Sequence, residues 1–502
     1  MRSTSSHPVD PGTPGRPFPG PPAPALTSAL ALLFAFPAPI HAHGIQEVRY
    51  SPPIPGWLFL IGGGLVVALS FVFIILRPDR GAGSTGYSRR EIPAGRGVRS
   101  SGRLLSGAGL LLAALILAGG FVGDTRSEDS LPPVLVWTGW WMGLTWLTLV
   151  IGNAWPALDP WNTVRRFFGR RMRRPLSLGL PYPAWLSAWP AVLLLLGFVW
   201  FELAWFQAQG AGGVVNYFLL FTAWLWAGMA VFDPESWWKN ANPYTRFFQV
   251  LGRFSPLEKR GDRIEVRIPG TALQASRLGH ASEAVFVIVV LFAVTFDGFV
   301  ATPEWWVILR RMMLKAFEIL PRSLAFHASF LFAILAGAVL FSAAYFTVCG
   351  VMSRLSLGKR RTAEVAGEFA MTLIPIAAAY HIAHFIPAVP GRVTRLVQAV
   401  SDPYGLGWNV FGWHAFKWDV QWTPEIAGVI WVIQTALIAL GHIASIWSSH
   451  RKALAIFKEK SMAAKVELPM ALLMIGYTVI SLWIISRPVL NGPLVPLPGI
   501  TP

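Results

Sequence analysis

Ten long apolar runs decide what this chain can fold into. Each holds about 20 residues, the length a helix needs to cross the ~30 Å hydrocarbon core of a bilayer. They cover residues 55–76, 104–123, 132–152, 182–203, 213–232, 284–301, 326–351, 368–389, 425–446 and 467–486. In lipid, the backbone polar groups of a single run are satisfied only within a helix. The sequence therefore predicts an all-α polytopic membrane bundle of about ten transmembrane helices.

Composition agrees with this fold class and indicates which partners the chain binds. Charged residues make up only 13% of the chain, against a soluble norm of roughly 25%. The single cysteine, Cys349, excludes an intramolecular disulfide. The net charge of +17 lies mostly in short loops beside apolar runs, where cytoplasmic loops of membrane proteins carry basic residues. We therefore expect the basic residues to lie at the surface of the lipid bilayer and not to bind nucleic acid.

The N-terminal residues resemble a processed leader. Residues 1–25 are rich in Pro, Ser and Gly, an apolar stretch runs from Leu26 to Phe36, and Ala42 ends a short segment suited to signal cleavage. We expect a signal sequence and disordered leader over 1–42, a transmembrane bundle over 43–490 and a Pro-rich tail over 491–502. Cleavage after Ala42 would make His43 the first residue. The alternative is an uncleaved first span.

Loop charges predict the orientation of the bundle. With the mature N-terminus outside, the inward loops carry basic clusters within 77–96, 165–174, 259–263, 359–361 and 451–460. Arg310, Arg311 and Lys315 fall on the outer side in this topology. An interfacial amphipathic helix from Trp305 to Ile319 would hold them at the membrane surface.

Ionisable residues within the apolar runs are candidates for function, because each costs several kcal/mol in hydrocarbon. His381 and His384 lie three residues apart in the eighth run, so a helix places both on one face, where they could share a metal ion. Asp297, late in the sixth run, would supply a carboxylate ligand or a general base. The alternatives are two hydrogen-bonded histidines and, for Asp297 before Gly298, a helix-terminal turn.

Other candidates lie on the same predicted outer side. His327 begins the seventh run, Asp402 lies in the loop after the eighth, and a free N-terminal His43 could chelate a metal. We therefore predict His384, His381, His327 and His43 as ligands of a divalent metal, with Asp297 and Asp402 as catalytic carboxylates. His442 in the ninth run is expected either to bond to a neighbouring helix or to line an inward-facing cavity. Glu368 and Gln434 are buried candidates without an obvious partner.

A short echo follows the third and fifth runs. Asp159-Pro160 and Asn242-Pro243 are each followed within a few residues by Arg-Phe-Phe. Asp or Asn before Pro starts a turn, so we expect two similar interfacial turns or a weak internal repeat. The commonest phosphate-loop, zinc-protease and serine-hydrolase motifs are absent from the sequence.

Three stretches together resemble a known family of bacterial multi-pass membrane proteins. They are Ala42-His43-Gly44 with Pro53-Ile54-Pro55-Gly56-Trp57-Leu58; Ile374-Pro375-Ile376-Ala377-Ala378-Ala379-Tyr380 with Ala383-His384-Phe385; and Gly441-His442-Ile443-Ala444 with His450 and Ala453. This pattern resembles the fenitrothion hydrolase-like family. The resemblance implies a bacterial cytoplasmic (inner) membrane and hydrolysis of the phosphorus to aryl-oxygen bond of a lipophilic thiophosphate triester. His384 matches the family pattern, whereas the position of His381 is apolar there.

The expected chemistry needs an activated water and a cation near the phosphoryl group. A bound metal supplies both, because it lowers the pKa of its water toward ~7, and Asp402 or Asp297 would act as general base. A transporter or metal permease with an outward-facing His/Asp site is the alternative function. A third hypothesis is a scaffold subunit that needs a partner membrane subunit.

Overall fold

The computed structural model describes residues 55–76, 89–171 and 177–487. Nine helices in these ranges are long and apolar enough to cross a membrane, and Trp189–Ala204 is a shorter apolar helix. The predicted all-α polytopic bundle is thus confirmed, and the chain is a multi-pass membrane protein. The fourth run is shorter than expected, because its helix begins only at Trp189, just before Pro190. The predicted signal sequence, His43 and the tail lie outside the described residues.

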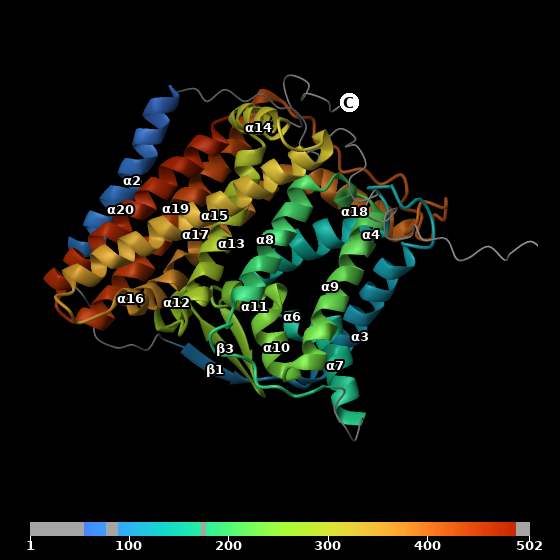
Figure 1. Cartoon of the computed structure of the whole chain (residues 1–502), viewed down its shortest axis with the longest axis horizontal. Coiled ribbons are helices and arrows are strands. Elements are labelled where there is room, and N and C mark those ends of the chain that lie inside the picture. Colours follow the sequence, from blue (N-terminus) through green and yellow to red (C-terminus); the bar gives the residue numbers. More distant parts are fainter. Residues whose placement is uncertain (1–54, 77–88, 172–176, 488–502) are drawn as a thin grey trace, which may run out of the picture.

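The long elements follow the predicted runs closely (Figure 1). They are α2 (Gly56–Leu76), α3 (Arg96–Ala118), the segment α4 (Leu131–Val134), η1 (Leu135–Leu144) and α5 (Thr145–Ile151), α8 (Trp189–Ala204), α9 (Ala211–Val231), α13 (Ala281–Val300), α15 (Arg322–Leu355), α19 (Pro424–Phe457) and α20 (Lys460–Ile485). The buried helix α13 packs against α8, α15 and α17 (Ile374–Phe385), while α2, α19 and α20 pack together beside them.

The eighth run forms a broken helix that is longer than expected. It consists of α16 (Thr362–Phe369), η3 (Ala370–Leu373), α17, η4 (Ile386–Ala388) and α18 (Val389–Ser401). The chain continues helically past the expected run, to Ser401, because Pro375, Pro387 and Pro390 all occupy first-turn positions. Proline is tolerated there, where its missing N–H would be unpaired anyway. Arg392 therefore lies on helix α18.

Short elements lie at the two ends of the bundle (Figure 1). The sheet, α7 (Pro160–Arg171) and α10 (Pro234–Ala241) lie at the end opposite to α14 (Pro303–Ala316) and α18. The sheet is antiparallel, with strand order β1 (Arg89–Pro93), β3 (Arg263–Arg267) and β2 (Leu257–Arg260). Other short helices are α6 (Trp155–Leu158), η2 (Phe206–Gln209), α11 (Pro243–Gly252) and α12 (Thr271–Ala275). The expected amphipathic helix near Trp305 is α14.

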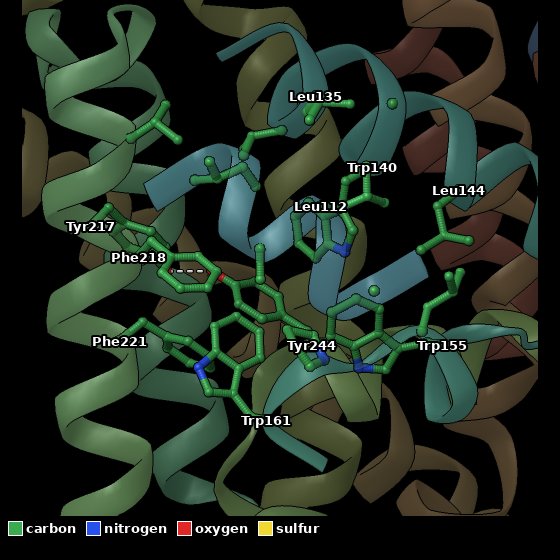
Figure 2. Close-up of a pocket in the computed structure, with 18 of the residues that line it drawn as sticks. Leu112, Leu135, Trp140, Leu144, Trp155, Trp161, Tyr217, Phe218, Phe221 and Tyr244 are labelled. Carbon is green, nitrogen blue, oxygen red and sulfur yellow. Dashed lines mark hydrogen bonds between the residues drawn. The ribbon is translucent and has the colours of Figure 1, made fainter. Parts of the chain in front are cut away.

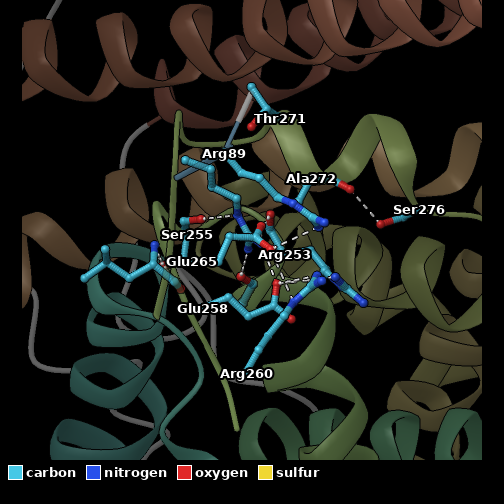
Figure 3. Close-up of polar contacts among 12 residues, drawn as sticks. Arg89, Arg253, Ser255, Glu258, Arg260, Glu265, Thr271, Ala272 and Ser276 are labelled. Carbon is cyan, nitrogen blue, oxygen red and sulfur yellow. Dashed lines mark hydrogen bonds and ion pairs between the residues drawn. The ribbon is translucent and has the colours of Figure 1, made fainter. Parts of the chain in front are cut away.

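A buried ion-pair network holds the sheet to the bundle (Figure 3). The Arg267 and Glu265 side chains are fully buried, and Arg267 Nη1 donates to Glu265 Oε1 over 3.0 Å and also to Glu258. Arg267 further donates to the carbonyl groups of Gly252 and Ser255. The guanidinium therefore fixes the chain that leads from α11 into β2. The sequence analysis predicted only basic loops here and missed the sheet.

The two echoed turns have the same local structure. Asp159 Oδ1 accepts from the backbone N–H of Asn162, and Asn242 Oδ1 accepts from that of Tyr244. Each side chain thereby satisfies a free N–H at the start of a short helix, α7 or α11. The following Phe pairs differ: Phe167 and Phe168 are half-exposed, whereas the pair in α11 is buried. The echo is therefore a repeated capping turn used in two environments.

Asp159 gives the folded protein a pH-dependent stability. Burial raises the pKa of Asp159 to about 6, although bonds from Asn162 and the Trp238 indole oppose the rise. A carboxyl group with a raised folded pKa stabilises the fold below its unfolded pKa, and this contribution is lost as pH rises through about 6. Asp159→Asn should therefore gain stability relative to wild type between pH 3.8 and about 6, by up to roughly 3 kcal/mol. The free energies of unfolding of both proteins, measured at pH 3.8 and at about pH 6, give this difference.

Asp233→Asn is the matched control with the opposite sign. Hydrogen bonds from the Ser236 backbone N–H and side chain lower the pKa of Asp233, which caps α10. Its contribution is present above pH 3.8 and lost as pH falls through the lower folded value. This variant should therefore lose stability at neutral pH. A parallel pH response of the two variants would contradict the assignment for Asp159.

Candidate functional site

A histidine–aspartate pair lies inside the bundle between α17 and α13. His384 Nε2 is 2.9 Å from Asp297 Oδ2, and the two side chains are 13% and 11% exposed. The expected approach of Asp297 to His384 is therefore observed. A carboxylate that accepts from one ring nitrogen fixes the tautomer of an imidazole and leaves the other nitrogen to accept a proton. The pair has the geometry of a general base with its orienting acid group.

A small cavity adjoins this pair. Its volume is about 10 Å³, close to the minimum for one water molecule, and its lining includes Trp141, Glu202 and His381 as well as the pair. The Glu202 carboxyl group is a hydrogen-bond partner of Trp141 and lies within electrostatic range of Asp297. Arg392 interacts electrostatically with both carboxylates. We call Glu202, Asp297, His381, His384 and Arg392 the polar cluster.

His381 adds a buried hydrogen-bond donor to the polar cluster. Its Nδ1 accepts from the Trp146 indole over 3.3 Å, so the proton of the neutral ring resides on Nε2. Nε2 is buried and has no hydrogen-bond partner. A buried unsatisfied donor costs about 1–3 kcal/mol. The cavity that His381 lines therefore favours a ligand atom that accepts a hydrogen bond.

Two other residues predicted for the site, His327 and Asp402, lie elsewhere in the structure. His327 packs against the rings of Trp200 and Trp205. The Asp402 carboxylate accepts from the backbone N–H groups of Leu406 and Gly407 and so closes the loop after α18. Neither residue lines the cavity.

The sequence predicted that His384, His381, His327 and His43 ligate a divalent metal. Across residues 55–76, 89–171 and 177–487, no group of three or more His, Cys, Asp or Glu side chains is placed to hold a metal ion. His43 lies outside these residues, and the divalent-metal assignment stays a prediction.

Sequence reasoning missed Glu202, Arg392 and Trp141. Glu202 lies in the apolar stretch Trp200-Phe201-Glu202-Leu203, so the cost of an intramembrane carboxylate could have marked it. Arg392 lies just beyond the predicted run 368–389 and so was not among the intramembrane candidates. No sequence signal distinguishes Trp141 among 24 tryptophans.

A second, much larger cavity, the aromatic cavity, is lined by many aromatic side chains (Figure 2). Its volume is about 360 Å³, within the range of small-molecule sites. Its walls come from α3, η1, α5, α6, α7, α8, α9 and α11. Its lining includes Trp140, Trp155, Trp161, Phe221 and the pair Tyr217 and Tyr244. The two tyrosine hydroxyl groups lie 2.5 Å apart. Such a lining suits a lipophilic, ring-containing molecule.

The aromatic cavity and the polar cluster share a wall. Trp140 lines the first and its neighbour Trp141 lines the second, both from the π-helix η1. The Phe198 ring contacts both indoles, at 6.0 and 5.0 Å between centroids. Glu202 also lies within electrostatic range of Tyr244. π-Helical turns occur frequently at functional sites, because they shift side chains relative to a regular helix.

Comparisons with known proteins identify no relative: no family model, no curated protein and no solved structure matches this chain. The resemblance to the fenitrothion hydrolase-like family therefore stays a prediction.

Proposed function

We propose that this chain is a membrane-embedded hydrolase of lipophilic phosphotriesters, thiophosphates included, in a bacterial cytoplasmic membrane with its mature N-terminus outside. The observation that supports it most is the His384–Asp297 pair beside a water-sized cavity. The adjoining aromatic cavity would hold the aryl group, and an apolar substrate would reach it from the bilayer, where it is concentrated.

The proposed reaction is a single displacement at phosphorus. A water oxygen attacks the phosphorus atom while its proton passes to the ring nitrogen of His384 that does not face Asp297. The phosphorus to aryl-oxygen bond breaks, and its electron pair leaves on the phenolate. Asp297 stabilises the imidazolium that forms. Arg392 and the Nε2–H group of His381 would stabilise negative charge on the phosphoryl oxygen or sulfur.

Turnover by the purified chain tests this function. Release of nitrophenol from a chromogenic thiophosphate triester is measured in liposomes, with and without a metal chelator. Activity that survives the chelator supports the His384–Asp297 pair acting alone, and activity that metal addition restores supports a metal-assisted reaction. Absence of turnover in every metal condition would contradict the proposal.

Filling the aromatic cavity should weaken substrate binding. Gly139 lines the cavity, and a Cβ atom there meets only the Leu135 side chain, at 3.8 Å. Gly139→Leu would remove roughly 50 Å² of apolar contact from the substrate, worth about 1.3 kcal/mol or about tenfold in KM. Gly197→Leu, an exposed site on α8 where a Cβ meets nothing within 4 Å, is the control. Equal KM values for the two variants would show that the aryl group binds elsewhere.

The broken helix favours transport as a second candidate. His384 lies on α17, the middle part of the interrupted segment Thr362–Ser401, and interrupted helices form the substrate sites of many transporters. Cells with and without the gene are compared for accumulation of divalent metal and for loss of a thiophosphate. Metal accumulation without thiophosphate loss would support a permease. Inactive protein that co-purifies with a second membrane chain would support a partner subunit.

A further inference from the structure

A stripe of polar residues follows the buried face of α19. His442, Ser445 and Ser449 are spaced three and four residues apart, so they lie on one face of the helix. Their exposed fractions are 1%, 0% and 0%. This face packs against α17 and α20 inside the apolar bundle. The reaction proposed above uses none of these residues.

At the His442 end of this stripe, two buried atoms have no hydrogen-bond partner. His442 Nδ1 is 2.8 Å from the Ile438 carbonyl oxygen, so Nδ1 donates and Nε2 is left as an acceptor. Nε2 and the Ser445 hydroxyl are both buried without a partner. A bare acceptor one turn from a free hydroxyl is the arrangement that a mobile proton or a transient water would satisfy.

A second buried titratable pair meets the stripe. His450 Nδ1 is 2.8 Å from Glu467 Oε2, and their side chains are 2% and 0% exposed. Among the described residues, the side chains that interact with Glu467 are those of His450 and Ser449. His450 Nε2 is buried and has no hydrogen-bond partner. A carboxyl group at this depth is costly, and intramembrane Glu and His chains are the usual parts of proton relays.

One end of the stripe reaches charged groups near solvent. Lys452, on the same helix, lies 2.5 Å from Glu368 and donates to the carbonyl groups of Gln274 and Ser276. Arg277 pairs with the same Glu368 over 3.4 Å, and its side chain is 56% exposed. Charged side chains therefore connect this end of α19 to the exposed Arg277, and protons could leave the bundle there.

At its other end the stripe borders α17, the helix that carries His384. Gln434 Nε2 donates to the carbonyl oxygen of Ala383, the residue before His384. About two turns further along α19, the two helices touch at Gly441, where a Cβ atom would lie 2.8 Å from the Pro375 carbonyl oxygen. The close approach brings the His442 region of α19 against the helix that carries His384.

We propose that His442, Ser445, Ser449, Glu467 and His450 form a proton relay through the α19–α20 interface, from the contact with α17 to the Lys452 end of the bundle. Each step moves one proton between a ring nitrogen, a hydroxyl group, a carboxylate or an inserted water. Nothing is oxidised, and no co-reactant is needed. The relay is independent of the proposed hydrolase, although it would remove the proton that hydrolysis releases.

Proton flux in vesicles tests the relay without any triester. The full chain is reconstituted into liposomes that contain a pH-sensitive dye, and a potassium diffusion potential is imposed with valinomycin. Wild-type vesicles should change internal pH faster than protein-free vesicles. Glu467→Gln keeps the shape of the side chain but carries no exchangeable acid proton, so its flux should fall to the protein-free rate. His442→Phe should behave in the same way.

Two further variants separate the relay from a general packing effect. Ser445→Ala removes a single hydroxyl from the stripe with little risk to folding, and its flux should fall as well. Ser481→Ala removes a hydroxyl that is also buried but lies on α20, 14 residues from Glu467 and ~21 Å along the helix, and its flux should equal that of wild type. Wild-type flux no faster than protein-free vesicles, unchanged flux in Ser445→Ala, or a flux that requires Na⁺ would each overturn the relay.

Discussion

Replacing His384 by alanine is expected to lower kcat for thiophosphate hydrolysis by about 10²-fold or more, the usual contribution of a general base. The ring accepts the proton of the attacking water while Asp297, 2.9 Å away, stabilises the charge that forms. Without the ring, the attacking water loses the base that Asp297 orients. Initial rates at saturating substrate, with purified protein in liposomes, measure the change.

His414→Ala is the control for this prediction. His414 lies in the exposed loop before α19, so its loss removes an imidazole without touching the polar cluster. Its kcat should stay at the wild-type value, and both variants should keep the wild-type melting temperature. A His384→Ala protein that is folded and fully active would remove the pair from the mechanism.

Replacing Glu265 by alanine is expected to destabilise the protein more than the same change at Glu91. Glu265→Ala leaves the fully buried guanidinium of Arg267 with less compensating charge, and breaking a buried pair from one side costs about 3–5 kcal/mol. Glu91→Ala is the matched control on β1, where the carboxylate pairs with the exposed Arg263. A surface pair of that kind contributes about 0–1 kcal/mol. The free energy of unfolding in detergent should separate the two variants, and similar values would contradict the buried network.

The helices could be predicted from the sequence because their signal is local. An apolar run of about 20 residues determines its own helix, and the expected runs 55–76 and 213–232 agree within two residues with α2 and α9. The sheet could not be predicted in this way. Arg89 and Glu265 pair across 176 positions of sequence, and the strands are short and charged.

The site was predictable only in part, for the same physical reason. Asp297 and His384 stood out because ionisable residues in apolar runs are few. Whether such residues meet depends on how helices rotate against one another, and this rotation turns His327 toward Trp200 and Trp205. The aromatic cavity is built from eight separate elements, so no single stretch of sequence predicts it.

The rate of nitrophenol release by wild-type and Asp297→Asn protein, in matched liposomes, tests the central claim most directly. Asparagine keeps the size of the side chain but cannot stabilise an imidazolium. The account predicts turnover by wild type and release at the rate of empty vesicles by a folded Asp297→Asn protein. Equal rates for the two proteins would contradict it.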